Sequence, residues 1–165
     1  MSFVARTHPQ QGPNEKVDDR ETPPEVFAEF DKRLGPFTLD VAASAHNTKV
    51  PSNYYSIEDD GLSAPWEGSV WCNPPYSNIR PWVEKAWSEW TQSIMAPYRI
   101  VMLLPANRTE QAWWQDLIEP ARLDGSLYVE FIRGRMRFIA AGDDEIKPNA
   151  RPPFGVCLVV WGLDL

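Results

Sequence analysis

Ser69-Val70-Trp71-Cys72-Asn73-Pro74-Pro75-Tyr76-Ser77 is the segment that most clearly predicts the fold, because it joins a buried strand to a rigid corner. Val70 to Cys72 form a short apolar run. The two prolines that follow end the strand, since proline fixes φ and has no N–H to donate to a neighbouring strand. The corner presents the amide oxygen of Asn73 and the flat ring of Tyr76. We interpret it as a preformed site for a planar amine; the alternative is an ordinary strand-to-turn exit with a buried tyrosine.

The composition predicts one globular domain. The chain has 165 residues, of which 43% are hydrophobic and 24% charged, and its 16 prolines enforce many turns. No stretch approaches the roughly 18 to 20 apolar residues of a membrane span, and residues 1–20 lack an apolar signal core, so we expect a cytoplasmic protein. Cys72 and Cys157 lie in apolar runs, where we expect reduced thiols and no metal site.

The formal net charge of −7 argues against a surface coated with nucleic-acid-binding lysine. It leaves room for a local basic face, which arginines at alternate positions near the end of the chain could provide. These are Arg133, Arg135 and Arg137.

The first part of the chain divides into an arm and a helix. Residues 1–20 have no apolar periodicity and predict a flexible arm, so the folded domain is assigned to residues 21–165. In Thr22-Pro23-Pro24-Glu25 we expect Thr22 to cap a helix, with Pro23 in its first turn and Glu25 completing a capping box.

Acidic residues then occupy two positions typical of ligand contacts in α/β proteins. Asp40 stands in the predicted strand Phe37 to Ala43, among apolar neighbours, and the small residue Ala42 lets a ligand approach the backbone. A buried carboxylate needs a partner, so Asp40 either caps a turn or binds a ligand with donors. About 20 residues later, Asp59 and Asp60 lie where ribose-binding acids occur in dinucleotide-type folds; a solvated acidic turn is the alternative.

The remaining pattern alternates helices and apolar strands. A helix is expected from Pro81, a buried strand at Arg99 to Pro105, late strands at Tyr128 to Ile132 and Met136 to Ile139, and a last buried strand at Phe154 to Trp161. This order predicts an α/β fold with a mainly parallel sheet and helices on both faces.

Five segments in this order resemble the small phage-type DNA N6-adenine methyltransferases, a Dam-like group of class I, Rossmann-like, S-adenosylmethionine-dependent enzymes with an NPPY motif. The segments are Thr22-Pro23-Pro24-Glu25, Leu39-Asp40-Val41-Ala42-Ala43, Asp59-Asp60-Gly61-Leu62 with Trp66, Trp71 to Ser77, and Gly134-Arg135-Met136-Arg137-Phe138. The resemblance implies methylation of adenine N6 in DNA and S-adenosylmethionine as cofactor. It implies host bacterial cytoplasm as the location if the gene is a phage gene.

The resemblance also implies roles for single residues. Asp40 would accept from the methionine amine of the cofactor, Thr22 and Pro23 would line its amino-acid end, and Asp59 or Asp60 would meet its ribose or adenine. One departure stands out: Asp40 is followed by Ala42-Ala43-Ser44 and not by the glycine-rich loop of many methyltransferases.

The chemistry of the target explains the corner. The lone pair of an adenine amine is delocalised into the ring, so two acceptors at its hydrogens, the Asn73 oxygen and the Pro74 carbonyl, would favour a pyramidal nitrogen aimed at the methyl group. Pro75 stiffens the corner, and Tyr76 would stack on a base that has left the duplex.

For DNA contacts we expect Arg133, Arg135 and Arg137, with Arg80 and Arg108 as further phosphate contacts; solubilising residues on an edge strand are the alternative.

The corner would equally hold a protein glutamine amide or an RNA amine, and a non-catalytic cofactor-binding or DNA-binding module is the alternative outside enzymes.

Overall fold

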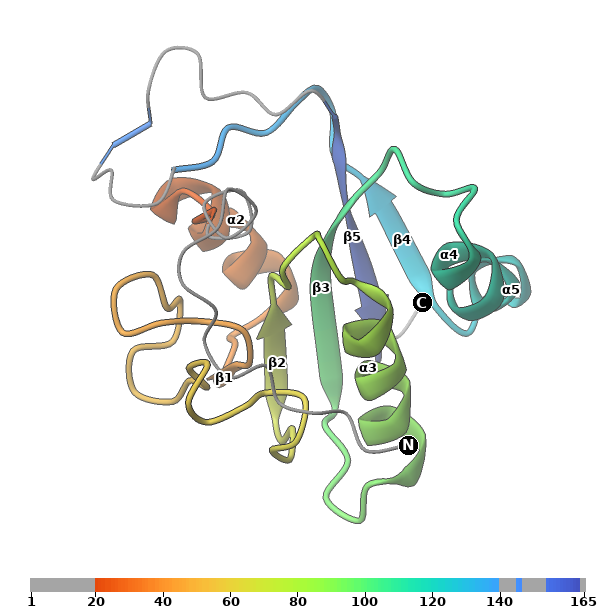
Figure 1. Ribbon diagram of the computed structural model, residues 1–165, viewed down its shortest axis with the longest axis horizontal. Coiled ribbons are helices and arrows are strands. Elements are labelled where there is room, and N and C mark those ends of the chain that lie inside the picture. The colour runs from red at the N-terminus through yellow and green to blue at the C-terminus, as the bar shows by residue number, and fades with distance from the viewer. Residues whose placement is uncertain (1–19, 140–144, 147–153, 164–165) are drawn as a thin grey trace.

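The computed structural model describes residues 20–139, 145–146 and 154–163. Figure 1 shows a central sheet with helices packed around it. The strands are β1 (Leu39–Asp40), β2 (Ser69–Cys72), β3 (Arg99–Pro105), β4 (Tyr128–Phe131) and β5 (Val156–Trp161). The helices are α2 (Pro24–Leu34), α3 (Arg80–Gln92), α4 (Ala112–Leu117) and α5 (Glu119–Asp124).

The five strands form one mixed sheet in the order β1-β2-β3-β5-β4. β1 pairs parallel with β2 and β2 parallel with β3, whereas β5 runs antiparallel to both β3 and β4. Four of these five strands therefore point one way and β5 points the other. Figure 1 shows the opposite directions of β4 and β5. The expected α/β fold with a mainly parallel sheet is confirmed.

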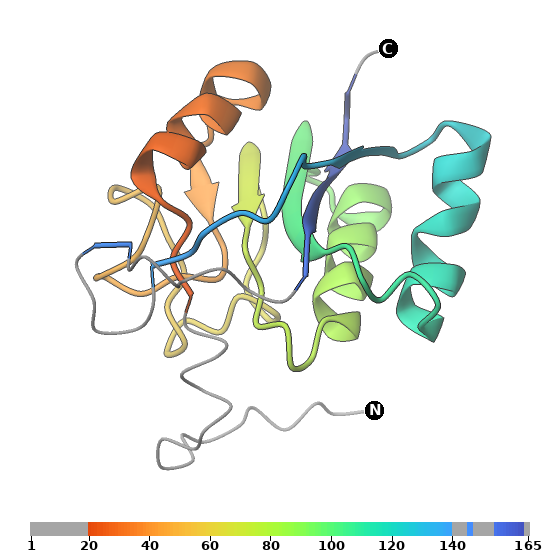
Figure 2. The same ribbon diagram turned by 90° about the horizontal axis from the view of Figure 1, so that it is seen from above.

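Helices cover both faces of the sheet, because the side chains of each strand alternate between them. On one face Trp71 and Val101 pack with Phe30 and Leu34 of α2. On the other face Val70, Ile100 and Met102 pack with Val83 and Ala86 of α3 and with the tryptophans of α4. Figure 2 shows α2 and α3 on opposite sides of the sheet. Burial of each large apolar side chain contributes about 1.5 to 3 kcal/mol, so the two cores fix the strand ends firmly.

Two predicted strands differ from the structure. The strand expected at Phe37 to Ala43 is reduced to Leu39–Asp40, because the chain turns from β2 toward a neighbouring loop: the Ala43 N–H donates to the Tyr55 carbonyl at 3.0 Å. The strand expected at Met136 to Ile139 is wrong. Gly134 has a φ of +74°, which turns the chain out of the sheet after β4, and only Ile139 pairs again, in an isolated bridge with Glu21.

The predicted cap of α2 is also wrong. The helix begins at Pro24 with Pro23 at the N-cap position, and no side chain caps it. The N–H groups of Val26 and Phe27 bond to the Pro23 carbonyl at 3.1 and 3.0 Å, and proline in the first turn needs no partner for a missing N–H. The hydroxyl of Thr22 therefore does not cap α2.

Candidate active site

The carboxyl ends of β1 and β2 lie side by side and bring the predicted site residues to one edge of the sheet. Asp40 is in register with Trp71, and the Val41 N–H donates to the Trp71 carbonyl at 3.1 Å. Asn73 follows β2 directly, so it leaves the sheet next to the loop that begins at Ala42. Ligands of open α/β sheets bind at this edge.

Asp40 is a buried carboxylate, only 3% exposed, with three donors around it. Its Oδ2 accepts from the Lys49 N–H at 2.8 Å and the Thr48 hydroxyl at 3.4 Å, and its Oδ1 accepts from the Ala42 N–H at 3.4 Å. Burial outweighs these donors and raises the pKa of Asp40 from 3.8 to about 6. Oδ1 has one long contact, and it retains acceptor capacity for a cationic ligand group.

Asn73 is half-buried and has a fixed orientation. Its Nδ2 donates to the main-chain carbonyl of Arg20 at 3.1 Å. Because the nitrogen is committed to this bond, the Oδ1 oxygen is the atom left to accept from a ligand, and no group within the described ranges donates to it. The oxygen that amine recognition requires is therefore the one that stays available.

The segment before α2 also reaches this site, where the resemblance places Thr22 and Pro23, but sequence reasoning missed the contacts of Arg20 and Glu21. Glu21 pairs with Lys49 at 2.7 Å, with both side chains largely buried, which fastens this segment to the loop beside Asp40. Next to it the hydroxyl of the buried Thr22 has no hydrogen-bond partner among the described residues. The sequence pattern places Arg20 in the arm, because apolar periodicity does not mark a residue that acts through its main-chain carbonyl.

The corner itself is more deeply buried than expected. Tyr76 is 8% exposed, its hydroxyl donates to the Leu103 carbonyl at 3.0 Å, and burial raises its pKa well above the ordinary value. Its ring contacts Phe138 edge-on and Phe154 at a tilt, with centroid distances of 6.5 and 6.0 Å. The expectation of an open ring for base stacking is therefore corrected: in this structure the two phenylalanines and the core cover Tyr76. Pro74 is buried and Pro75 half-buried.

The acidic turn that contains Asp59 and Asp60 lies beside the site, but both carboxylates accept hydrogen bonds from within the turn. Asp59 accepts from the Ser56 N–H at 2.8 Å and the Ser56 hydroxyl at 2.7 Å, and these bonds lower the pKa of Asp59. Asp60, at a φ of +54°, accepts from the Leu62 N–H and the Ser63 hydroxyl. A Cβ on Gly61 would lie 2.0 Å from the Val41 carbonyl oxygen, so the turn approaches the loop after β1 closely.

The five predicted DNA-contacting arginines fall into two groups. Arg80 pairs with Glu84 at 2.9 Å and Asp116 at 3.3 Å, and Arg108 donates to the Tyr76 carbonyl. The other three are exposed, while Met136 and Phe138 between and after them are buried. Exposed and buried side chains therefore alternate from Arg135 to Phe138, although this segment does not form a strand.

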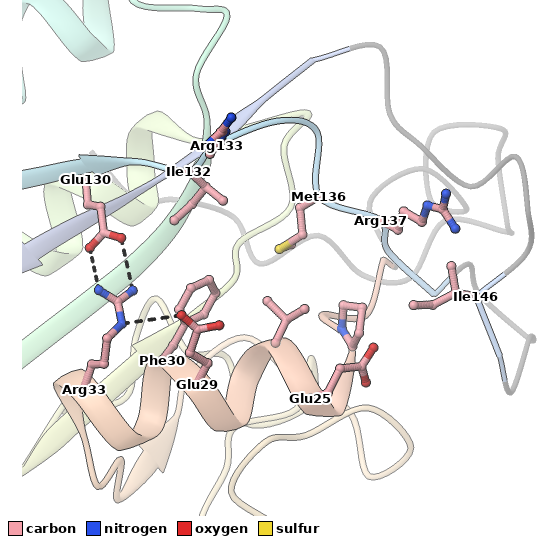
Figure 3. A pocket seen from close by; sticks show the side chains of 12 residues that line it. Glu25, Glu29, Phe30, Arg33, Glu130, Ile132, Arg133, Met136, Arg137 and Ile146 are labelled. Carbon is pink, nitrogen blue, oxygen red and sulfur yellow. Dashed lines mark hydrogen bonds and ion pairs between the residues drawn. The ribbon is translucent and has the colours of Figure 1, made fainter.

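A cavity of about 560 Å³ lies between α2 and the segment 130–137. Figure 3 shows Arg33 closing one end, held by Glu130 and Glu29, with Met136 over the middle and Arg137 toward the other end. Arg133 and Arg137 line it, as does Pro23, the residue after Thr22. Its lining includes neither Asp40 nor Asn73, the residues at the carboxyl ends of β1 and β2 that we call, with Thr22 beside them, the strand-end site.

Comparison with known proteins identifies the family. Residues 10–161 match the DNA N-6-adenine-methyltransferase (Dam) family. This chain belongs to that family. A DNA N-6-adenine-methyltransferase of Haemophilus phage HP1 is 42% identical over 82 residues, which are 49% of this chain and 44% of the relative. Another, of Escherichia phage T1, is 35% identical over 133 residues, which are 72% of this chain and 52% of the relative.

This Dam-family chain spans about half the length of the curated relatives it matches. A solved structure of a candidate RNA methyltransferase from Pyrococcus horikoshii shares 12% identity at a TM-score of 0.45, covering 83% of this chain and 67% of the other; a likeness this remote carries no argument. Among the helices that the structure describes, none is long and apolar enough to cross a membrane.

Proposed function

We propose that this Dam-family chain transfers a methyl group from S-adenosylmethionine to the N6 amine of adenine in DNA. The observation that carries the proposal is the orientation of Asn73. Its nitrogen is held by the Arg20 carbonyl, and its oxygen is left for a donor beside the buried Asp40. Both relatives that match are named DNA N-6-adenine-methyltransferase, which supports adenine as the target base.

The residues at the strand ends fit the cofactor. Its amino-acid end carries an ammonium group and a carboxylate. The Asp40 carboxylate is buried and suits the ammonium, and the hydroxyl of Thr22, which has no partner among the described residues, offers a donor for the carboxylate. Pro23 and Ala42 leave these contacts unobstructed by long side chains. Asp59 and Asp60, for which the resemblance implies a contact with the ribose or adenine, each accept hydrogen bonds within their own turn, so we propose only a small contribution from them to cofactor binding.

The chain's contribution to transfer is orientation and electrostatics. When bound, S-adenosylmethionine supplies an electrophilic methyl group and the intrinsic reactivity. Asn73 Oδ1 and the Pro74 carbonyl accept the two amine hydrogens, which localises the lone pair on nitrogen and aims it out of the ring plane. Pro75 and Tyr76 hold these acceptors in place, Tyr76 through its bond to Leu103. No side-chain nucleophile is needed.

DNA is proposed to meet the face that carries Arg133, Arg135 and Arg137. These side chains are exposed and could neutralise phosphates, whereas the net charge of −7 makes non-specific binding elsewhere on the chain weak. Arg80 can join them, because surface ion pairs such as its pairs with Glu84 and Asp116 are worth little and exchange readily. The target adenine must leave the duplex to reach a corner at a sheet edge.

The proposal is tested by supplying labelled S-adenosylmethionine with DNA, RNA or protein in separate reactions. We expect label in DNA alone, recovered as N6-methyladenine after digestion, and none in DNA lacking adenine. Transfer to RNA or to a glutamine side chain would replace the proposed substrate. Cofactor binding without transfer to any of the three would identify a non-catalytic module.

A further inference from the structure

Arg108 lies where it can brace the catalytic corner. It stands three residues after the end of β3, in a loop fixed at both sides: the Ala106 N–H donates to the Gly155 carbonyl at 2.9 Å, and the Arg108 carbonyl accepts from the Gln111 N–H at 3.1 Å. Its half-buried guanidinium turns back toward the corner, where Nη1 donates to the main-chain carbonyl of Tyr76.

The corner needs such a brace because its own backbone makes few hydrogen bonds. Pro74 and Pro75 have no N–H, and the backbone bond that joins described residues of this turn runs from the Asn78 N–H to the Pro75 carbonyl at 3.3 Å. Among the described residues, side-chain bonds from three separate places hold it: Asn73 to Arg20, the Tyr76 hydroxyl to Leu103, and Arg108 to Tyr76. Of these three bonds, that of Arg108 alone has a charged donor, the stronger class.

We infer that Arg108 is a positioning residue that fixes the Tyr76 main chain, and through it the amine acceptors Asn73 and Pro74, and that it is not a phosphate contact. Its charge also lies close enough to Tyr76 to oppose the rise of the tyrosine pKa. The exposed Arg135 makes no ion pair within the described part of the chain, and it is the matched comparison. The inference rests on the proposed function for its effect on transfer, but not for its effect on the corner.

Two measurements on Arg108→Ala, Arg108→Lys and Arg135→Ala separate the roles. The first is hydrogen exchange at the amides of residues 76–79 in the cofactor-free protein. The second is the slope of log affinity for a DNA duplex against log salt, which falls by about 0.9 when one phosphate contact is lost. We expect Arg108→Ala to accelerate exchange severalfold and to leave the salt slope unchanged. Arg135→Ala should leave exchange unchanged and reduce the salt slope by about 0.9. Arg108→Lys, which keeps a cationic donor, should restore part of the protection and covers the case in which the alanine variant does not fold.

Turnover adds the functional consequence. Arg108→Ala should lower kcat about 10- to 100-fold with little change in KM for DNA, because the acceptors are misplaced by small distances. Unchanged exchange at residues 76–79, or a salt slope reduced by about 0.9, would overturn the inference. If the wild-type chain transfers no methyl group to DNA, the proposed function fails, whereas hydrogen exchange still decides the role of Arg108.

Discussion

The strand-end site and the acidic turn contain the same kinds of polar atom, but they use them differently. In the turn, Asp59 and Asp60 accept from serine hydroxyls and backbone N–H groups within three residues of themselves. At the strand ends, Asn73 binds Arg20 53 positions away, and Thr22 binds nothing that the structure describes. Local bonds satisfy a carboxylate and stabilise a turn. Side chains that are held by distant parts of the chain and still have unused hydrogen-bonding capacity are better candidates for ligand contacts.

Asn73→Ala is expected to have the largest effect on methyl transfer. The loss of one preorganised acceptor should lower kcat about 10²- to 10³-fold, while cofactor affinity changes less than about threefold. Single-turnover methylation and calorimetric titration with S-adenosylhomocysteine measure the two effects. Asn78→Ala, on the exposed side of the same corner, serves as the control and should retain turnover. Undiminished turnover in Asn73→Ala would remove the amine-binding role from the strand-end site.

A second test uses the charge of Asp40. Asp40→Asn should weaken cofactor binding about 10- to 100-fold at pH 8, because a hydrogen bond to a charged group contributes about 1.5 to 3 kcal/mol. In the wild-type protein only the ionised carboxylate attracts the ammonium group. With a pKa of about 6, affinity should be level above pH 7 and about tenfold lower at pH 5. A pH profile that is the same in Asp40→Asn would show that another group titrates.

The same pKa makes a prediction about the stability of the cofactor-free protein. The pKa of Asp40 is raised on folding, so the native state binds the proton more tightly than the unfolded state. The contribution of Asp40 to the free energy of unfolding therefore falls as pH rises from about 4 to about 6. Urea unfolding across this range should show the fall in the wild-type protein and its absence in Asp40→Asn. An Asp40 contribution that rises with pH would contradict the sign.

Thr22→Val is expected to have a smaller effect, on cofactor affinity and not on stability. Since the hydroxyl is buried and has no partner in the described part of the chain, a methyl group in its place should leave the free energy of unfolding unchanged or raise it by up to about 1 kcal/mol. Cofactor affinity should fall about 5- to 10-fold. Thr48→Val is the matched control: its hydroxyl donates to Asp40 and accepts from the Val50 N–H, so stability should drop by about 1 to 2 kcal/mol. A destabilised Thr22→Val would show that Thr22 has a structural partner.

The smallest effect is expected in the acidic turn. Asp59→Asn and Asp60→Asn keep an acceptor oxygen, and asparagine tolerates the positive φ of position 60. Cofactor affinity should change less than about twofold in each. A tenfold loss in either variant would restore that residue to the cofactor site and would end the contrast between the two regions.

Sequence reasoning predicted the sheet because long apolar runs such as those at Arg99–Pro105 and Val156–Trp161 bury whole strands, and it placed Asp40 and Asn73 at strand ends for the same reason. It failed where a side chain's partner is distant in sequence. The bond from Asn73 to Arg20, the bond from Arg108 to Tyr76 and the covering of Tyr76 by Phe138 and Phe154 depend on tertiary packing. Thr22 shows the limit of local rules, since a capping pattern is present in the sequence and the helix forms without that cap.

The position of β5 has a consequence for synthesis of the protein. This strand is made after β4, yet it lies between β3 and β4, and all six of its residues are buried. While the ribosome is still adding residues before Val156, β3 has an unpaired apolar edge and β4 has no neighbour to join. A nascent chain at that stage exposes an unpaired apolar strand edge, the kind of surface that aggregates readily, until β5 is made.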